Sequence, residues 1–184
     1  VANTTGANNT AVGLSALTAN TTGANLVALG SSALVANTTG NSNVGIGYLA
    51  LDANTTASNN IAIGQHAVGT NTTGASNVGI GHEALYLNTT AANNTAVGFQ
   101  ALRANTTGAS NTGVGSGAGD AVTTGAYNTM IGKDAGGATT TADGNVVVGE
   151  SAFLVNTTGA ANVAIGANSL GSNTTASNNI AVGK

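Results

Sequence analysis

A glycine recurs every 17 residues along this chain of 184 residues, and that spacing limits the possible folds more than any other feature. The glycines are Gly13, Gly30, Gly47, Gly64, Gly81, Gly98, Gly115, Gly132, Gly149, Gly166 and Gly183, with no insertion or deletion between them. With this glycine as position 1, the repeat is G-x-x-A-L-x-A-N-T-T-G-A-S-N-V-A-I. A fixed period over the whole chain indicates a solenoid, in which each repeat forms one coil stacked on the next.

The repeat is too short for a strand, a helix and a return, so its pattern favours an all-β coil. Positions 14 to 17 alternate polar, large, small and large side chains, which predicts a short strand. The glycine ends this strand in a bend with positive φ, positions 3 to 7 are expected to form a second short strand, and N-T-T-G-A-S a turn. We therefore predict a parallel, in-register β-roll or β-solenoid of about eleven coils, roughly 50 Å long at about 4.8 Å per coil.

The whole chain, residues 1–184, is expected to be one repetitive segment. It has neither a capping helix nor a polar terminal repeat, which solenoids usually need, so we interpret it as part of a longer fibre.

Stacking places each residue on the one 17 positions earlier, so repeated polar residues form ladders. The asparagines at positions 8 and 14 are predicted to pair their side-chain amides along the rod. The threonines at positions 9 and 10 would bond turn backbone groups or face water. N-T-T is also an acceptor sequence for N-glycosylation, but sugars on coils about 4.8 Å apart would be too crowded for full occupancy.

Two coils depart from the repeat in a way that predicts an internal contact. Position 5 is large and apolar except at Gly119 and Gly136, and position 16 is Ala or Gly except at Met130 and Val147. The volume lost at one position is matched by volume gained at the other, as close packing requires. Positions 5 and 16 are therefore predicted to touch inside the roll.

Positions 15 and 17 then point outward, and a single chain would expose a continuous aliphatic stripe. Its members are Val44, Ile46, Ile61, Ile63, Val78, Ile80, Val97, Val114, Ile131, Val146, Val148, Val163 and Ile165. Exposed apolar surfaces of this extent are typical of interfaces. Cyclic association about the rod axis would bury the stripe identically in every coil, and we expect a homotrimer.

The composition excludes several classes of function. Three Lys and Arg against six Asp and Glu give no basic surface for nucleic acid. No run reaches the roughly 20 apolar residues of a membrane span, so we expect no membrane insertion. A narrow roll filled by Ala and Leu leaves no pocket for a nucleophile and its base, and we expect no enzyme activity, catalytic residue, cofactor or metal.

Nearly all the chemistry lies at the variable positions 2, 3 and 6, which are expected on outward loops. The candidate surface-contact residues are Tyr48, His66, His82, Glu83, Phe99, Gln100, Lys133, Asp134 and Glu150. Stacking predicts the ion pairs Arg103 with Asp120 and Lys133 with Glu150. It also predicts a cation–π contact of Arg103 with Tyr86.

Two further surface features carry weaker predictions. His66, His82 and Glu83 lie close enough in the pattern for a metal, but isolated surface residues of these types are usually solvated. Coils 116–149 lose the leucine and the asparagine of the repeat, and there we expect a local groove.

The unit A-V-G-x-x-A-L-x-A-N-T-T-G-A-S-N-T, seen best in N-T-A-V-G-F-Q-A-L from Asn94 to Leu102, resembles known fibre repeats. It is similar to the head repeats of trimeric autotransporter adhesins of the YadA type, and more closely to the shafts of bacteriophage tail fibres. The resemblance implies a trimeric, left-handed parallel β-roll that serves as an extracellular adhesive rod on a virion or a bacterial cell. Its partners would be further copies of the chain, around the rod or end to end, and a cell-surface receptor or glycan.

Two alternatives remain open. A monomeric solenoid could bind ice or another regular lattice through its threonine ladders, although adjacent threonines should point to opposite faces. A matrix filament could grow by stacking open rod ends.

Overall fold

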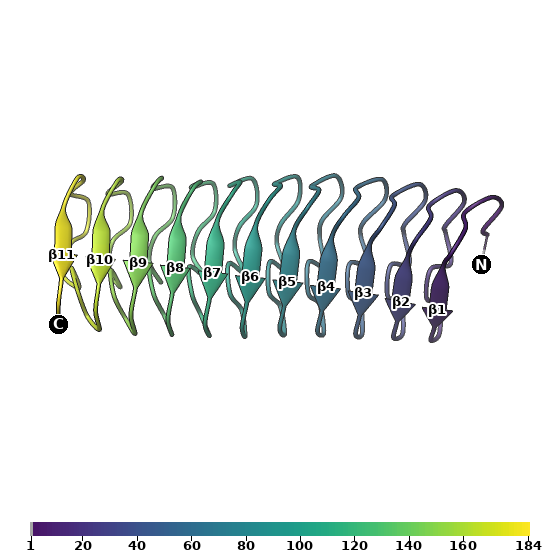
Figure 1. Ribbon diagram of the computed structural model, residues 1–184, viewed down its shortest axis with the longest axis horizontal. Helices are drawn as coiled ribbons and strands as arrows, with labels where there is room; N and C mark the ends of the chain where they lie inside the picture. Colours follow the sequence, from purple (N-terminus) through teal and green to yellow (C-terminus); the bar gives the residue numbers. More distant parts are fainter. Residues whose placement is uncertain (1) are drawn as a thin grey trace.

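The computed structural model, which describes residues 2–184, is a straight β-solenoid (Figure 1). Its strands are β1 (Thr10–Val12), β2 (Val27–Leu29), β3 (Val44–Ile46), β4 (Ile61–Ile63), β5 (Val78–Ile80), β6 (Thr95–Val97), β7 (Thr112–Val114), β8 (Thr129–Ile131), β9 (Val146–Val148), β10 (Val163–Ile165) and β11 (Ile180–Val182). They form one parallel sheet in sequence order, and residues 2–184 contain no helix. The predicted all-β solenoid with 17-residue coils is confirmed.

Every strand covers positions 15 to 17 of its repeat and pairs in register with its neighbours. Ala62 of β4 lies beside Gly79 of β5, one repeat away. The middle residue of each strand from β2 to β10 is buried and the two flanking residues are partly or largely exposed. The strand is one residue shorter than expected, because the asparagine at position 14 lies just before it.

The glycine at position 1 is needed for two reasons. Gly30 has φ of +133°, a conformation that side chains rarely adopt. A Cβ on this residue would also lie 2.5 Å from the carbonyl oxygen of Gly47 in the next coil. The predicted positive-φ bend is confirmed, and the close approach of successive coils explains why the glycine is never replaced.

The second strand expected at positions 3 to 7 is absent from residues 2–184, and that prediction is wrong. These residues form turns, with positive φ at position 3 (Ser32, +58°) and position 5 (Leu34, +51°). Ala33 and Leu34 are adjacent and both fully buried, whereas neighbours in a strand point to opposite faces. The positive φ of Leu34 lets its side chain and that of Ala33 both point inward. The backbone N–H of Leu34 still donates to Ala50 O in the next coil (3.0 Å).

The predicted contact between positions 5 and 16 is confirmed. A Cβ on Gly45 would lie 3.2 Å from Leu34 Cγ, so a small residue at position 16 makes room for the leucine. In the exceptional coils the relation reverses, because a Cβ on Gly119 or Gly136 would lie 2.6 or 2.8 Å from Met130 Sδ. Met130 thus fills the space that two glycines leave open.

The two asparagine ladders differ in their hydrogen bonds. At position 8, Asn37 Nδ2 donates to Asn20 Oδ1 in the previous coil (3.0 Å) and to Gly40 O in its own turn (3.0 Å). At position 14, Asn60 Nδ2 instead donates to Gly74 O (2.9 Å), and Asn60 Oδ1 accepts from the backbone N–H of Asn77. The predicted amide pairing therefore holds at position 8, whereas the ladder at position 14 mainly supports the backbone.

Some side-chain pairing also occurs at position 14, in the later coils. Asn128 Nδ2 donates to Asn111 Oδ1 (3.1 Å), and Asn145 Nδ2 to Asn128 Oδ1 (3.2 Å).

The ladder at position 8 is interrupted where Val122 and Thr139 replace asparagine. Asn105 Oδ1, which would accept from an asparagine at residue 122, is buried without a hydrogen-bond partner, and so is Thr139 Oγ1. Each buried unpaired group costs about 1–3 kcal/mol. Two further buried atoms without a partner, His82 Nδ1 and Asn94 Nδ2, lie in an earlier coil of the described residues, where this ladder is intact.

The two threonines of each turn have different roles, one bonding the backbone and the other facing water. At position 9, both the N–H and Oγ1 of Thr38 donate to Thr55 O in the next coil (2.8 and 3.0 Å). The threonine at position 10, such as Thr39 or Thr56, is exposed. Only one of the two threonine columns therefore offers free hydroxyl groups.

Candidate functional site

The first candidate surface is the aliphatic stripe formed by positions 15 and 17 on the outer face of the sheet. Ile63, Ile131 and Ile165 are 37, 40 and 38% exposed, although their strands are paired on both sides. The predicted outward orientation of these residues is confirmed. Threonine replaces the aliphatic residue at position 15 in β6, β7 and β8, so the position-17 column is the more continuous half of the stripe.

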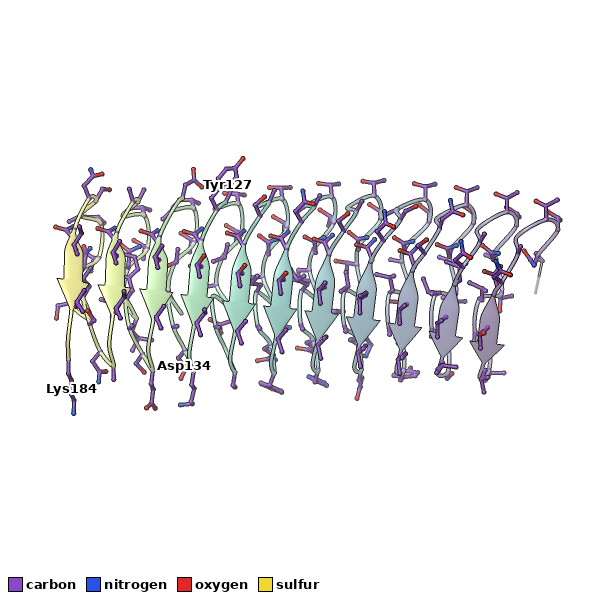
Figure 2. The ribbon with its side chains drawn as sticks, viewed as in Figure 1. Tyr127, Asp134 and Lys184 are labelled. Atoms are coloured by element: carbon purple, nitrogen blue, oxygen red, sulfur yellow. The ribbon has the colours of Figure 1, made fainter. Side chains whose placement is uncertain are left out.

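The second candidate lies on the edge of the rod that carries positions 2 and 3 and on the adjoining side at position 6. Figure 2 shows Asp134 and Lys184, at positions 3 and 2, on the edge opposite to Tyr127 at position 13. Five rings gather at the three positions within residues 47–114: Tyr48, His66, His82, Tyr86 and Phe99. We call these residues, together with Glu83, Gln100 and Arg103, the aromatic surface.

The rings of the aromatic surface form two files. In the first, Tyr48 and His66 meet edge to face with centroids 5.6 Å apart, and His66 and Tyr86 do so at 5.7 Å. In the second, His82 stacks on Phe99 with centroids 5.4 Å apart and planes 10° from parallel. Contacts of this geometry are favourable and fix the ring orientations.

Gly69 provides the room for the Tyr86 ring. A Cβ on this glycine would lie 2.9 Å from Tyr86 Cδ2, in the position-6 column that both residues share. The first file is therefore diagonal, with its members at positions 2, 3 and 6 of successive coils.

Arg103 completes the first file and joins it to the polar groups. Its Cζ lies 5.7 Å from the Tyr86 ring centroid, so the predicted cation–π contact is confirmed. Its Nε donates to Glu83 Oε2 (2.7 Å), an oxygen that also accepts from Gln100 Nε2 (2.8 Å). These hydrogen bonds, that of Arg103 first, lower the pKa of Glu83.

The predicted pair of Arg103 with Asp120 is therefore wrong. The arginine reaches back to the preceding coil, where it bonds Glu83 at position 3 instead of Asp120 in the next coil of its own column. Asp120 is partly buried, and this burial, followed by the nearby charge of Asp134, raises its pKa.

The predicted pair of Lys133 with Glu150 is also wrong. Lys133 Nζ lies 3.0 Å from Asp134 Oδ2, its neighbour in the chain. This contact raises the pKa of Lys133, and Glu150 adds a smaller effect through its charge alone. Exposed pairs of this kind contribute about 0–1 kcal/mol, so they balance charge along the edge without defining a site.

The described residues contain no cluster of side chains suited to metal binding. No group of three His, Asp or Glu side chains is close enough to hold an ion in residues 2–184. That part of the chain also has no pocket, so the groove expected in coils 116–149 is not present. It contains no helix that could cross a membrane.

The sequence predicts six of the eight members of the aromatic surface as contact residues, but it does not predict one consequence of stacking. Tyr86 and Arg103 were expected to touch each other, but not to join the rings at positions 2 and 3. The signal was present in the spacing, because His66 and Tyr86 are 20 residues apart, one repeat plus three positions.

Searches against protein-family models, curated proteins and solved structures find no match to this chain. The function of the chain must therefore be inferred from its two surfaces.

Proposed function

We propose that the chain is a shaft segment of an extracellular fibre, homotrimeric and parallel, on a bacteriophage or a bacterial surface, where it spaces or mediates attachment. The aliphatic stripe is the observation that carries this proposal. It runs along consecutive strands, and its members remain more than one third exposed in a single chain at positions such as Ile63 and Ile131.

The stripe has the chemistry of an interface core. It contains only Val, Ile, Leu and Thr side chains from β2 to β10, without a charged residue. Soluble proteins rarely leave so long an apolar surface open to water. Because each coil presents the same two columns, association around an axis parallel to the rod buries every coil equally.

Three copies, rather than the two of a back-to-back dimer, are proposed because the resembling fibre repeats are trimeric. The remaining surface suits an extended rod. Outside the aromatic surface it is mostly Ala, Ser, Thr, Asn and Gly, which gives a polar and weakly charged exterior.

Charged substitutions in the stripe test this proposal against a matched control. We expect the variant Ile63→Glu/Ile80→Glu to dissociate, because six carboxylates would meet in the apolar centre of a trimer. The control Thr56→Glu/Thr73→Glu places the same charges in the same two coils, at the exposed position 10. Light scattering should give a three-chain mass for the wild type and the control and a one-chain mass for the stripe variant. An equal mass for all three proteins would contradict the proposed interface.

The lattice-binding solenoid is the second candidate, favoured by the exposed threonine column at position 10. The threonines at position 9 donate their hydroxyls to the next coil, which leaves a single column instead of a two-dimensional array. A wild-type chain that is monomeric and shows thermal hysteresis would place this function first.

A further inference from the structure

Five of the seven Tyr, Phe and His rings of this protein lie on the aromatic surface, within four consecutive coils. The other two are Phe153, which is fully buried, and Tyr127, on the opposite edge. We propose that the aromatic surface binds a neutral oligosaccharide, laid along the rod axis. This inference deepens the adhesive part of the proposed function and rests on it.

The fold does not require these rings. Other coils carry Ser31 or Ser116 at position 2 and Gly137 or Gly171 at position 6, and they stack in the same register. Tyr48 and Phe99 are about half exposed, so they add little to the core. Large side chains that a scaffold neither buries nor needs indicate a binding role.

The surface is ordered without a ligand. Edge-to-face contacts hold Tyr48 and His66, parallel stacking holds His82, and Glu83 holds Arg103. Ordering flexible side chains weakens binding, so groups that are already fixed favour it.

The chemistry fits a sugar. The apolar faces of a pyranose pack on aromatic rings, as other apolar groups do, while its hydroxyls need planar donors and acceptors nearby. Gln100 and Arg103 supply donors and Glu83 supplies acceptor oxygens beside the rings. Because Arg103 neutralises Glu83, the site lacks the excess positive charge that a phosphate-rich or sulfated polymer would need.

The shape of the surface supports an extended ligand. Residues 2–184 offer no pocket, so the ligand must lie on the surface. Four coils at about 4.8 Å span roughly 14 Å from first to last, which a short chain of pyranose units can follow. A standard protein interface needs about 800 Å² on each partner, more than so short a band supplies.

Electrophoresis of the full chain through native gels containing a soluble polysaccharide tests the proposal. The neutral probes are dextran, mannan, galactomannan and hydroxyethyl cellulose, and heparin is the anionic comparison. The test variant, Tyr48→Ser/Phe99→Ser, introduces the residue that other coils carry at position 2. The matched control, Tyr127→Ser, removes an exposed ring from the opposite edge, where other coils also carry serine.

We expect at least one neutral polysaccharide to retard the wild type and the control equally. The test variant should bind that polysaccharide at least about tenfold more weakly. The proposal is overturned if no neutral probe retards the wild type, if only heparin does, or if the test variant binds as tightly as the wild type. Protein ligands would then become the better explanation of the surface.

Light scattering on the same samples separates this proposal from that of the fibre shaft. Equal masses for the wild type and both variants show that assembly is intact, so any lost binding belongs to the rings. A monomeric wild type that still binds a neutral polysaccharide would refute the trimer and leave the sugar site standing. A trimeric wild type that binds no neutral polysaccharide would refute the sugar site and leave the trimer standing.

Discussion

Met130, at position 16, fills the core volume that is empty at position 5 in two coils, where glycine replaces a large apolar residue. Truncating the methionine should show this directly. Its Sδ fills the space beside Gly119 and Gly136. Met130→Ala leaves a cavity in a fully buried site, and such truncations cost about 2–5 kcal/mol of unfolding free energy. In the wild type, Gly119→Leu should also destabilise, by about 1–3 kcal/mol or more, because its side chain would meet Met130.

Together the two substitutions restore the common pattern of leucine at position 5 and alanine at position 16. The backbone accepts leucine there, because Leu102 occupies the same position with φ of +50°, close to the +59° of Gly119. We therefore expect the double variant to recover most of the loss, with a coupling free energy of about 2 kcal/mol or more. Chemical denaturation at fixed chain concentration measures all four proteins. If Gly119→Leu destabilises the wild type and Met130→Ala equally, the two positions do not share space and the packing argument fails.

Three further variants test other parts of the structure. Val122→Asn supplies the amide donor that Asn105 Oδ1 lacks, and thermal denaturation should show a gain of about 1 kcal/mol; a loss would mean that the valine packs better than the ladder bonds. Gly81→Ala places a Cβ against the carbonyl oxygen of Gly98 at a φ of +133°, and we expect a loss of about 2 kcal/mol or more, against little change for a serine at the exposed Thr73. The folded pKa of Asp120 lies above its usual 3.8, so the folded state holds the proton longer and stability falls as pH rises from there through the raised pKa. Asp120→Asn should remove this fall in stability, so that above the raised pKa the variant gains stability relative to the wild type. An unchanged pH profile of the unfolding free energy would contradict the burial effect.

The sequence predicted those parts of the fold that the period fixes. A glycine locked to every seventeenth residue sets the coil, and the alternation around residues such as Ala62 sets which strand residues face inward. Paired exceptions to the repeat, such as Gly119 with Met130, then indicate from the sequence alone that the two positions touch inside the solenoid, as the structure has them.

The return segment could not be predicted in the same way. Its course depends on positive φ at residues such as Leu34 and Val68, and neither leucine nor valine normally signals that conformation. The adjacent apolar pair Ala33–Leu34 was the only hint, because a strand cannot bury both.

The ion pairs were mispredicted for a related reason. Stacking alone predicts straight columns of side chains, whereas long side chains reach diagonally to another position of a neighbouring coil. Arg103 therefore pairs with Glu83, at position 3 of the preceding coil, and the file from Tyr48 to Tyr86 follows the same slant.

Small-angle X-ray scattering on the wild-type chain tests the central claim most directly, because it reports particle mass, rod length and rod cross-section together. We predict a mass three times 17.4 kDa, the length of one solenoid (about 50 Å) and an enlarged cross-section, independent of concentration. One-chain mass with the cross-section of a single solenoid would contradict the claim that the aliphatic stripe is an interface. Length that grows with concentration at constant cross-section would contradict it as well, and would favour filaments built end to end.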